Sequence, residues 1–571
     1  MKNLFFAFVL LFLLSSDNSL AMTTNSKFLK ISIIPEPVKI VSGDTSFEIN
    51  DNTLIVASDV DQLKSAVFLN GYLSKYYEFN LKVVAEKPKN KSKKQKTLQY
   101  INLAITDIAY AHAGFSPTDL KREGAYSISI KNGVANLSGA NPQGLFYAVQ
   151  TLIQMLPTTK PVSVLNSPSV TLPVQAIEVV DYPRFVYRGM HLDVVRHIYS
   201  VEYIKKYIDY LALHKMNYFH WHLTDDQAWR MESKKYPKLN EIGSWRAGTI
   251  IGIFPGTGVD STRYGGFYTV DQMKEIVKYA EERYITIVPE IDVPGHSMAI
   301  IASYPQYSTT PEIPKHPAIT WGIFNRQNNV LAPSEEVFTF LKDVFEELMD
   351  VFPGPYIHIG ADECSKKWWK ESPETQNFMK RYGLKDEDEL QSYFVKRIAA
   401  VVTGRGRQMV GWDEIMEGGL VEGAVVMSWR DAEHGWKAAA MGHKAILTPI
   451  LYSYFNIAQK HNEDSLCHKN WYVPVDSVYL FEPVPESVSE SASANILGGQ
   501  GCMWTEYFSN IKALEYGVFP RLSAIAEVYW SQRRHKNWPK FQLKLIDQFN
   551  RYDLWGTNYS TEVFKSGGFS R

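Results

Sequence analysis

Cysteine is scarce in this chain of 571 residues, which has 3 cysteines, at Cys364, Cys467 and Cys502. A small and odd set does not form a disulfide framework, and none of them shows the Cys-x-x-Cys spacing that is typical of a metal site. We interpret all of them as buried or inert thiols.

An excess of charge of either sign is also absent. Lysine and arginine number 60 and aspartate and glutamate 61, so the formal net charge is −1. A near-neutral chain gives no electrostatic reason to expect binding to nucleic acid or to an anionic membrane. One basic run, from Lys87 to Lys96, contains no aromatic residue, and such a run is usually a solvated loop. We expect no nucleic-acid partner.

Long apolar runs are missing after the N-terminus. Near the start, Lys2 precedes an apolar run from Leu4 to Leu14, and small residues lead to Ala21. This pattern is typical of a secretory signal peptide over residues 1–21, and the run is too short to span a bilayer. No cysteine lies near the expected cleavage site to carry a lipid. We therefore expect an exported, soluble protein in the periplasm or the extracellular space, with no membrane anchor.

What the chain does contain is the composition of a globular protein, with 45% hydrophobic and 21% charged residues, and its length suggests two or three domains. Residues 22–180 are predicted to form a small α+β domain. Two alternating strands meet at Asn132-Gly133, the strongest short signal for a hairpin, and the helix that follows has Pro142 at its start. Charged residues and a proline at 181–184 mark the end of this domain.

Strands alternate with amphipathic helices from Tyr187 onward, which indicates parallel βαβ units. The predicted strands are 187–194, 217–223, 285–291, 356–361, 407–412, 424–429, 444–449 and 496–504. Eight such strands fit a (β/α)8 TIM barrel with insertions, one of them Gly-rich and aromatic at 246–266. The predicted fold class is therefore α/β. The barrel covers residues 181–571 with a C-terminal helical segment, and the smaller α+β domain precedes it.

Polar and aromatic residues follow these strands, at the end where TIM barrels carry their active sites. Carboxylates hydrogen-bond hydroxyl groups, and tryptophan faces pack against the apolar face of a sugar ring. Such an inventory suits a neutral carbohydrate. In chain order, the candidates are Arg196, Asp225, Asp292, His296, Asp362, Glu363, Trp412, Trp429, Tyr454, Asn456, Trp504 and Glu506.

One strand end carries the sequence HIGADE, residues 358–363, which closely resembles the signature of family 20 glycoside hydrolases, the exo-acting β-N-acetylhexosaminidases. Further stretches that resemble the family pattern stand in the family's order at 182–197, 219–230, 289–296, 411–415 and 498–506. The N-terminal domain also looks like the family's usual non-catalytic partner domain. The resemblance covers nearly the whole mature chain.

The adjacent acids of this motif raise a geometric problem, because neighbouring side chains of a regular strand point to opposite faces. Asp362 and Glu363 can share a pocket only where the strand ends, after the flexible Gly360. The resemblance implies substrate-assisted hydrolysis, in which the substrate's 2-acetamido oxygen attacks the anomeric carbon and forms an oxazolinium-like intermediate. Glu363 would act as acid and then as base, while Asp362 would stay ionised and orient the acetamide. Repulsion between the acids would help to keep Glu363 protonated.

The resemblance assigns roles to the remaining polar residues by matching positions. Arg196 and Glu506 would hold the sugar hydroxyls at positions 3 and 4, with Asp225 beside the ring or beside Arg196. Asn456 stands where many family members have aspartate, and it would face the 6-position of the sugar. The preference at that position is therefore open.

The resemblance also places residues around the acetamide. His296, held by Asp292, would hydrogen-bond Glu363 and tune it. Tyr454 would donate its hydroxyl to the acetamide oxygen. The expected partner is an oligosaccharide or glycoconjugate substrate, and no cofactor is expected. The acetamide methyl and the ring face would be enclosed by Trp412, Trp429 and Trp504.

Two other classes of protein stay open. One is a catalytically impaired N-acetylhexosamine-binding protein that kept the pocket, and the other is a metal-assisted barrel hydrolase. His220 and His222 alternate onto one face of a strand, but without a third histidine or cysteine nearby, and closed metal sites need three or four ligands. We therefore expect no metal. Arg188 and Asp193 are interpreted as buried barrel residues. The natural glycan, the choice between gluco and galacto sugars and the oligomeric state stay open.

Overall fold

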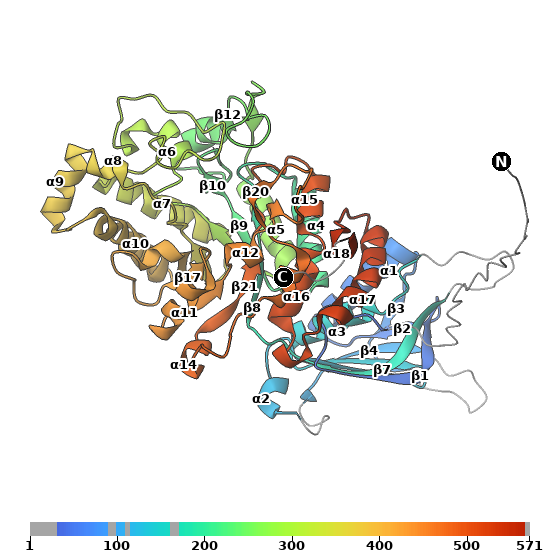
Figure 1. Cartoon of the computed structure of the whole chain (residues 1–571). Coiled ribbons are helices and arrows are strands. Elements are labelled where there is room, and N and C mark those ends of the chain that lie inside the picture. The colour runs from blue at the N-terminus through green and yellow to red at the C-terminus, as the bar shows by residue number, and fades with distance from the viewer. Residues whose placement is uncertain (1–30, 89–98, 109–114, 160–170, 566–571) are drawn as a thin grey trace, which may run out of the picture.

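The computed structural model describes residues 31–88, 99–108, 115–159 and 171–565. A large unit of strands and helices lies beside a smaller unit dominated by one sheet (Figure 1). The predicted signal peptide and most of the basic run that starts at Lys87 lie outside the described residues. Within the described ranges, no helix is long and apolar enough to cross a membrane.

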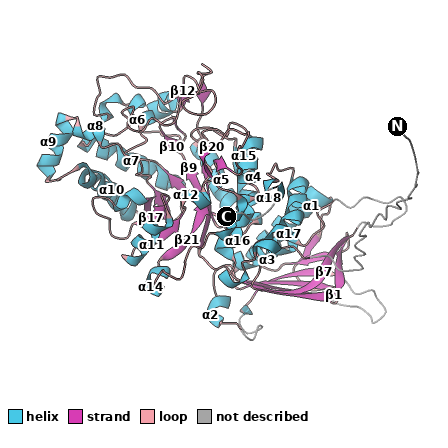
Figure 2. Ribbon diagram, in the orientation of Figure 1, coloured by secondary structure: helices cyan, strands magenta, loops and turns pink. Residues whose placement is uncertain are grey.

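The smaller unit is a seven-stranded mixed sheet with strand order β1-β7-β5-β6-β4-β2-β3. Two helices, α1 (Val60–Tyr77) and α3 (Pro142–Gln154), pack on the sheet, and the C-terminal helix α17 (Trp538–Trp555) lies beside them (Figure 2) and hydrogen-bonds both. This is the predicted α+β domain. Its strands are β1 (Lys39–Ile49), β2 (Leu54–Val56), β3 (Lys82–Val84), β4 (Tyr100–Ile105), β5 (Tyr126–Lys131), β6 (Val134–Gly139) and β7 (Leu172–Asp181).

Local sequence signals explain two of these elements. Strands β5 and β6 pair antiparallel across Asn132 and Gly133, which have φ angles of 52° and 77°. Positive φ at both central residues is what a tight hairpin turn requires, and asparagine and glycine tolerate it best. Helix α3 begins at Pro142, and the Asn141 side chain accepts a hydrogen bond from the Gly144 amide, which satisfies one of the free donors of the first turn.

The larger unit is a closed barrel of parallel strands, as predicted. The strands follow each other around the barrel in the order β14-β15-β16-β17-β18-β21-β8-β9. Their bounds are β8 (Tyr187–Asp193), β9 (Tyr218–His222), β14 (Thr286–Glu290), β15 (Tyr356–His358), β16 (Gln408–Trp412), β17 (Val425–Ser428), β18 (Ala445–Leu447) and β21 (Ile496–Gly501). Closure brings the C-terminal ends of all these strands to one mouth, where TIM barrels carry their sites.

Helices cover the outside of the barrel and are separated from the strands by a continuous apolar core. Helix α5 begins with a capping box, in which the side chains and backbone amides of Thr269 and Gln272 bond each other reciprocally, as expected at a helix start. The main helices are α4 (Val201–Leu213), α5 (Val270–Glu281), α7 (Glu335–Val351), α10 (Glu387–Gly404), α11 (Ala432–Ala440), α15 (Ile511–Val518) and α16 (Arg521–Trp530).

A buried ion pair joins the two units. The Lys215 ammonium lies 3.2 Å from a carboxylate oxygen of Asp181, at the end of β7, and both side chains are fully buried. The Trp530 indole donates to the same carboxylate. Helix α17 adds hydrogen bonds from Arg551 to the carbonyls of Ser32 and Gln154. These contacts fix the base of the barrel, opposite the mouth, against the N-terminal domain.

The three cysteines are free and buried, in line with their interpretation as inert thiols. Burial raises the pKa of Cys364 to about 12, so this thiol, which directly follows the acid pair, stays protonated near neutral pH. The glycine-rich insertion is closed at its base, where β12 (Trp245–Arg246) pairs with β13 (Tyr264–Gly265).

Candidate active site

The acid pair sits on a left-handed turn at the end of β15. Gly360, Ala361 and Glu363 have φ angles of 66°, 72° and 42°, so the alternation of the strand is broken before the acids begin. At Gly360 an added Cβ would lie 1.8 Å from the Asp292 carboxylate, which only glycine avoids. The turn lets Asp362 and Glu363 face the same mouth, as the sequence predicted from the end of the strand.

The two acids have different surroundings. The side chain of Asp362 is 14% exposed and that of Glu363 is 43% exposed. Burial, together with repulsion from Glu363, raises the pKa of Asp362 to about 6, although His296 opposes the shift. One oxygen of Asp362 is buried and has no hydrogen-bond partner in the described structure. A donor on a bound ligand, such as an amide N–H, would satisfy it.

His296 faces both acids. Its Nε2 lies 3.5 Å from Glu363 Oε2 and 3.8 Å from Asp362 Oδ2. Its Nδ1 lies 3.1 Å from Asp225 Oδ1 and 3.0 Å from Asp226 Oδ2. Burial alone would lower the pKa of His296, but Asp225 and Asp226 hold it well above the usual value. The ring is therefore a cation beside the acid pair at neutral pH.

The prediction that Asp292 holds His296 is wrong. Asp292 accepts a hydrogen bond from the Ala361 amide instead, and burial and the neighbouring Asp362 raise its pKa well above the usual value. The two residues are close in sequence, but the chain turns between them, and the ring of His296 points to the loop after β9. Asp226, which replaces Asp292 in this role, stands beside the predicted Asp225 in the sequence.

Arg196 is fixed by Asp225, which decides between the two positions expected for that aspartate. Arg196 Nη2 lies 2.5 Å from Asp225 Oδ2, and Arg196 Nη1 lies 3.2 Å from Asp193 Oδ2. Gln227 accepts a third hydrogen bond from Nε. Asp193 is fully buried, as is Arg188, so both are barrel residues as interpreted from the sequence. Asp193 nevertheless serves the site indirectly, because it helps to hold the guanidinium.

Glu506 follows β21, and its charge acts on that of Arg196. Burial alone would raise the pKa of Glu506, but the hydrogen bond with His468 and the charge of Arg196 lower it to about 2. His468 Nε2 lies 3.4 Å from Glu506 Oε1. Oε2 of Glu506 and Oδ1 of Asn456 are buried and lack hydrogen-bond partners in the described structure. These orphaned acceptors suit the hydroxyls of a bound sugar. No sequence signal pointed to His468.

Aromatic residues line the rest of the mouth. The rings of Trp429 and Tyr454 are stacked with centroids 6.3 Å apart, and Trp504 lies 6.3 Å from Tyr454 and 6.0 Å from Trp412. Burial raises the pKa of Tyr454 well above 10, so its hydroxyl remains a hydrogen-bond donor. The Glu414 carboxylate accepts a hydrogen bond from the indole N–H of Trp429 at 3.0 Å and so orients that wall.

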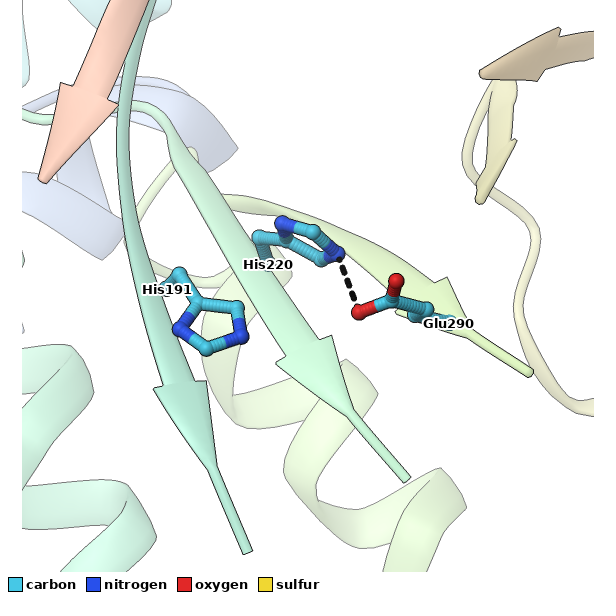
Figure 3. A group of neighbouring side chains, drawn as sticks. All are labelled: His191, His220 and Glu290. Carbon is cyan, nitrogen blue, oxygen red and sulfur yellow. Dashed lines mark ion pairs between the residues drawn. The ribbon is translucent and has the colours of Figure 1, made fainter. Parts of the chain in front are cut away.

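Among the residues that the structure describes, three groups of side chains have the donor types of a metal site. They are His191, His220 and Glu290 (Figure 3), then Asp225, Asp226 and His296, and finally Asp292, His296 and Asp362. The expectation that His220 and His222 have no third histidine nearby is wrong, because the barrel brings in His191 and His358 from other strands. These contacts join residues far apart in the sequence, which alternation within one strand does not reveal.

Two family models match this chain. The model described as the catalytic domain of glycosyl hydrolase family 20 matches residues 185–533. The model for domain 2 of the same family matches residues 30–182. Together they cover both units of the fold.

Known proteins with similar sequences carry the name beta-hexosaminidase. That of Porphyromonas gingivalis is 40% identical over 544 residues, which are 95% of this chain and 66% of the relative. That of Vibrio furnissii is 36% identical over 71% of this chain and 65% of the relative. The chain thus spans just under two-thirds of the length of these relatives.

Solved structures also resemble this fold. An exo-β-N-acetylglucosaminidase from Vibrio harveyi, solved in complex with N-acetylglucosamine, has a TM-score of 0.78 and 30% identity, and the match covers 93% of this chain and 78% of that one. A β-N-acetylhexosaminidase from Streptomyces coelicolor has a TM-score of 0.75 and 26% identity, with 93% and 97% covered.

Proposed function

This chain belongs to glycosyl hydrolase family 20, and we propose that it removes terminal, non-reducing β-linked N-acetylglucosamine or N-acetylgalactosamine residues from glycans. One observation carries the proposal. Asp362 and Glu363 share one mouth on a left-handed turn, the first mostly covered with one buried, orphaned oxygen and the second accessible. That arrangement gives one carboxylate to orient a substrate group and one acid to reach the glycosidic oxygen.

In the proposed mechanism no carboxylate of the enzyme attacks the sugar. Glu363 protonates the leaving oxygen while the substrate's acetamide oxygen attacks the anomeric carbon, which breaks the glycosidic bond and forms an oxazolinium ion. Asp362 accepts a hydrogen bond from the acetamide N–H and stabilises the positive charge that develops on that nitrogen. Tyr454 donates to the acetamide oxygen. Water then attacks the anomeric carbon and gives its proton to Glu363, so the β-configuration is retained.

Recognition of the sugar divides between charged and aromatic residues. Arg196 and Glu506 bind the hydroxyls at positions 3 and 4, and Asn456 faces the 6-position. Trp412, Trp429 and Trp504 enclose the acetamide methyl and the ring face. Because Asp225 is paired with Arg196, we assign that aspartate to hold the guanidinium rather than the sugar.

Export completes the proposal. Residues 1–21 have the pattern of a signal peptide, so we place the mature enzyme in the periplasm or outside the cell. Its partner there is an oligosaccharide or glycoconjugate that ends in an N-acetylhexosamine. Fractionation of cells that express the full chain tests this, with residues 1–21 deleted as the control.

The activity itself is tested with purified protein and two chromogenic substrates, the β-glycosides of N-acetylglucosamine and N-acetylgalactosamine. We expect turnover of at least one of them, and we expect that a chelator does not diminish this turnover and that Glu363→Gln lowers it. Tight binding of N-acetylglucosamine without turnover would indicate the impaired binding protein instead. Loss of turnover with a chelator, restored by a divalent ion, would indicate a metal-assisted hydrolase.

A further inference from the structure

Glu290, the last residue of β14, is the centre of a fully buried polar cluster beneath the mouth. Its Oε2 lies 2.5 Å from His222 Nδ1 and 3.1 Å from His220 Nε2. Its Oε1 accepts a hydrogen bond from the indole N–H of Trp412 at 2.9 Å and lies 3.0 Å from His358 Nδ1. Figure 3 shows how its carboxylate is directed at the ring of His220 on the neighbouring strand. An unpaired carboxylate at this depth would be prohibitively costly, so the hydrogen bonds from His222 and Trp412 are required.

His222 links this carboxylate to the mouth. Its Nδ1 faces Glu290, and its Nε2 lies 3.0 Å from Asp225 Oδ2. A neutral imidazole has one N–H and can donate to only one of two carboxylates, whereas the imidazolium donates to both. Burial opposes the charge, but Glu290 and Asp225 raise the pKa of His222 to about 10. His222 is thus a fixed cation between two anions.

Asp225 contacts two further residues of the mouth, Arg196 and His296. Its Oδ2, which also faces His222, lies 2.5 Å from Arg196 Nη2. Its Oδ1 lies 3.1 Å from His296 Nδ1. Burial alone would raise the pKa of Asp225, but Arg196, His296 and His222 hold it well below the usual value. The Asp225 carboxylate therefore positions both His296, beside the acid pair, and the guanidinium of Arg196.

We propose that Glu290 and His222 are positioning residues that clamp Asp225 from inside the barrel, and through it fix both Arg196 and His296. The charges alternate along the line from Glu290 through His222 and Asp225 to His296, so each anion has a cation beside it. Neither inner residue touches the sugar. The catalytic role of this clamp rests on the proposed function, but the charge state of His222 does not.

A metal ion is the rival occupant of the inner cluster, because His191, His220 and Glu290 offer three donor atoms within 4.8 Å of one another. Burial lowers the pKa of His191 well below the usual value and that of His220 to about 4, so both rings are neutral, as ligands must be. However, the Glu290 oxygen that faces His220 also receives the His222 imidazolium at 2.5 Å. A dication there would face an adjacent positive charge, so the contacts favour the clamp.

The charge state is tested by nitrogen NMR of histidine-labelled protein. In the wild type, two buried histidines, His222 and His296, should keep both ring protons at about pH 8.5. His222→Gln identifies one of these signals by its loss. In Glu290→Gln, His222 loses one of its two anionic neighbours, so its pKa should fall below about 8 and its ring should carry a single proton at about pH 8.5. His296 keeps Asp225 and Asp226 and should stay doubly protonated. A singly protonated His222 in the wild type at neutral pH overturns the proposal, and so does a stoichiometric metal ion in the purified protein.

The positioning role is tested by kinetics on the same variants. Glu290→Gln should lower kcat/KM about tenfold to a hundredfold, the range typical of lost supporting contacts, with effects on both KM, through Arg196, and kcat, through His296. The matched control is His191→Gln, in the same layer, whose ring nitrogens have no hydrogen-bond partner in the described structure. Its kcat/KM should stay within about threefold. A folded Glu290→Gln variant with wild-type kcat and KM would contradict the clamp. An inactive wild-type protein would contradict the proposed function, and the NMR result alone would then decide the charge state of His222.

Discussion

Asp362 and Glu363 are adjacent in the chain, yet the first side chain is 14% exposed and the second 43% exposed. The left-handed turn after β15 produces this difference by setting one carboxyl group into the barrel mouth and the other at its rim. A buried group is the better one to hold a substrate amide, and an accessible one can reach both the leaving oxygen and water. The roles proposed for the pair follow from this difference in position.

Glu363→Gln removes the proton that the leaving oxygen needs. Because a positioned general acid contributes about 10²–10⁴-fold, the variant should slow substrates with alkoxide-like leaving groups by that amount. Substrates with phenolate-like leaving groups need less protonation and should lose less in the first step. Pre-steady-state rates for both substrate types measure this, and an equal loss in the glycosylation step would remove Glu363 from the acid role.

The acid limb of the pH profile should report Asp362. This group must be ionised to orient the acetamide, and its pKa is raised to about 6, so kcat/KM should rise as the pH increases through about 6 and should be lost below it. Replacement of His296 by asparagine removes a cation that lowers this pKa, and the limb should move to higher pH. His468→Asn is the control, because His468 faces Glu506 instead. An acid limb that stays in place in His296→Asn would contradict the assignment.

Gly360 should be intolerant of any side chain. Gly360→Ala places a methyl group 1.8 Å from the Asp292 carboxylate, which must displace the turn that carries both acids, so activity should fall by at least about a hundredfold. Gly383→Ala is a matched control, with a φ of 69° and no atom within 4 Å of the added group. It should keep full activity and lose only about 1–2 kcal/mol of unfolding free energy. Activity assays and thermal unfolding of both variants provide the comparison.

Asn456 should set the response to charge at the 6-position of the sugar. An aspartate there would repel a 6-sulfated substrate, by up to about 4 kcal/mol for charges about 4 Å apart at an effective dielectric of 20. Even about 1.4 kcal/mol is tenfold in selectivity. The ratio of kcat/KM on sulfated and unsulfated N-acetylglucosaminides should therefore fall at least about tenfold in Asn456→Asp. An unchanged ratio would make Asn456 a structural residue only.

The barrel and the line of candidate residues could be predicted because strand alternation and strand ends are local patterns. The acid pair is an example, since HIGADE shows both the strand and the glycine that ends it. The partners of His296 could not be predicted in the same way. Asp292 is the near acid in sequence, but Asp225 and Asp226 reach the ring from the segment after β9, and that neighbour relation exists only once the barrel has closed.

The inner cluster shows the same limit. His220 and His222 looked isolated because their partners come from β8, β14 and β15. His468 was missed because it begins β20 (His468–Tyr472), a short strand outside the barrel, where no sequence pattern marks a residue that faces Glu506. Contacts within one element follow from spacing, whereas contacts across the barrel depend on register and closure.

Use of the substrate's acetamide is the central claim, and one matched comparison tests it most directly. The wild-type enzyme is given the 4-nitrophenyl β-glycosides of N-acetylglucosamine and of glucose, which differ only at the 2-position, and kcat/KM is measured for both. Rapid hydrolysis of the first and essentially none of the second is expected, because no enzyme carboxylate replaces the missing acetamide. Comparable hydrolysis of the two, or a covalent adduct on a carboxylate with a 2-fluoro sugar, would contradict the substrate-assisted mechanism.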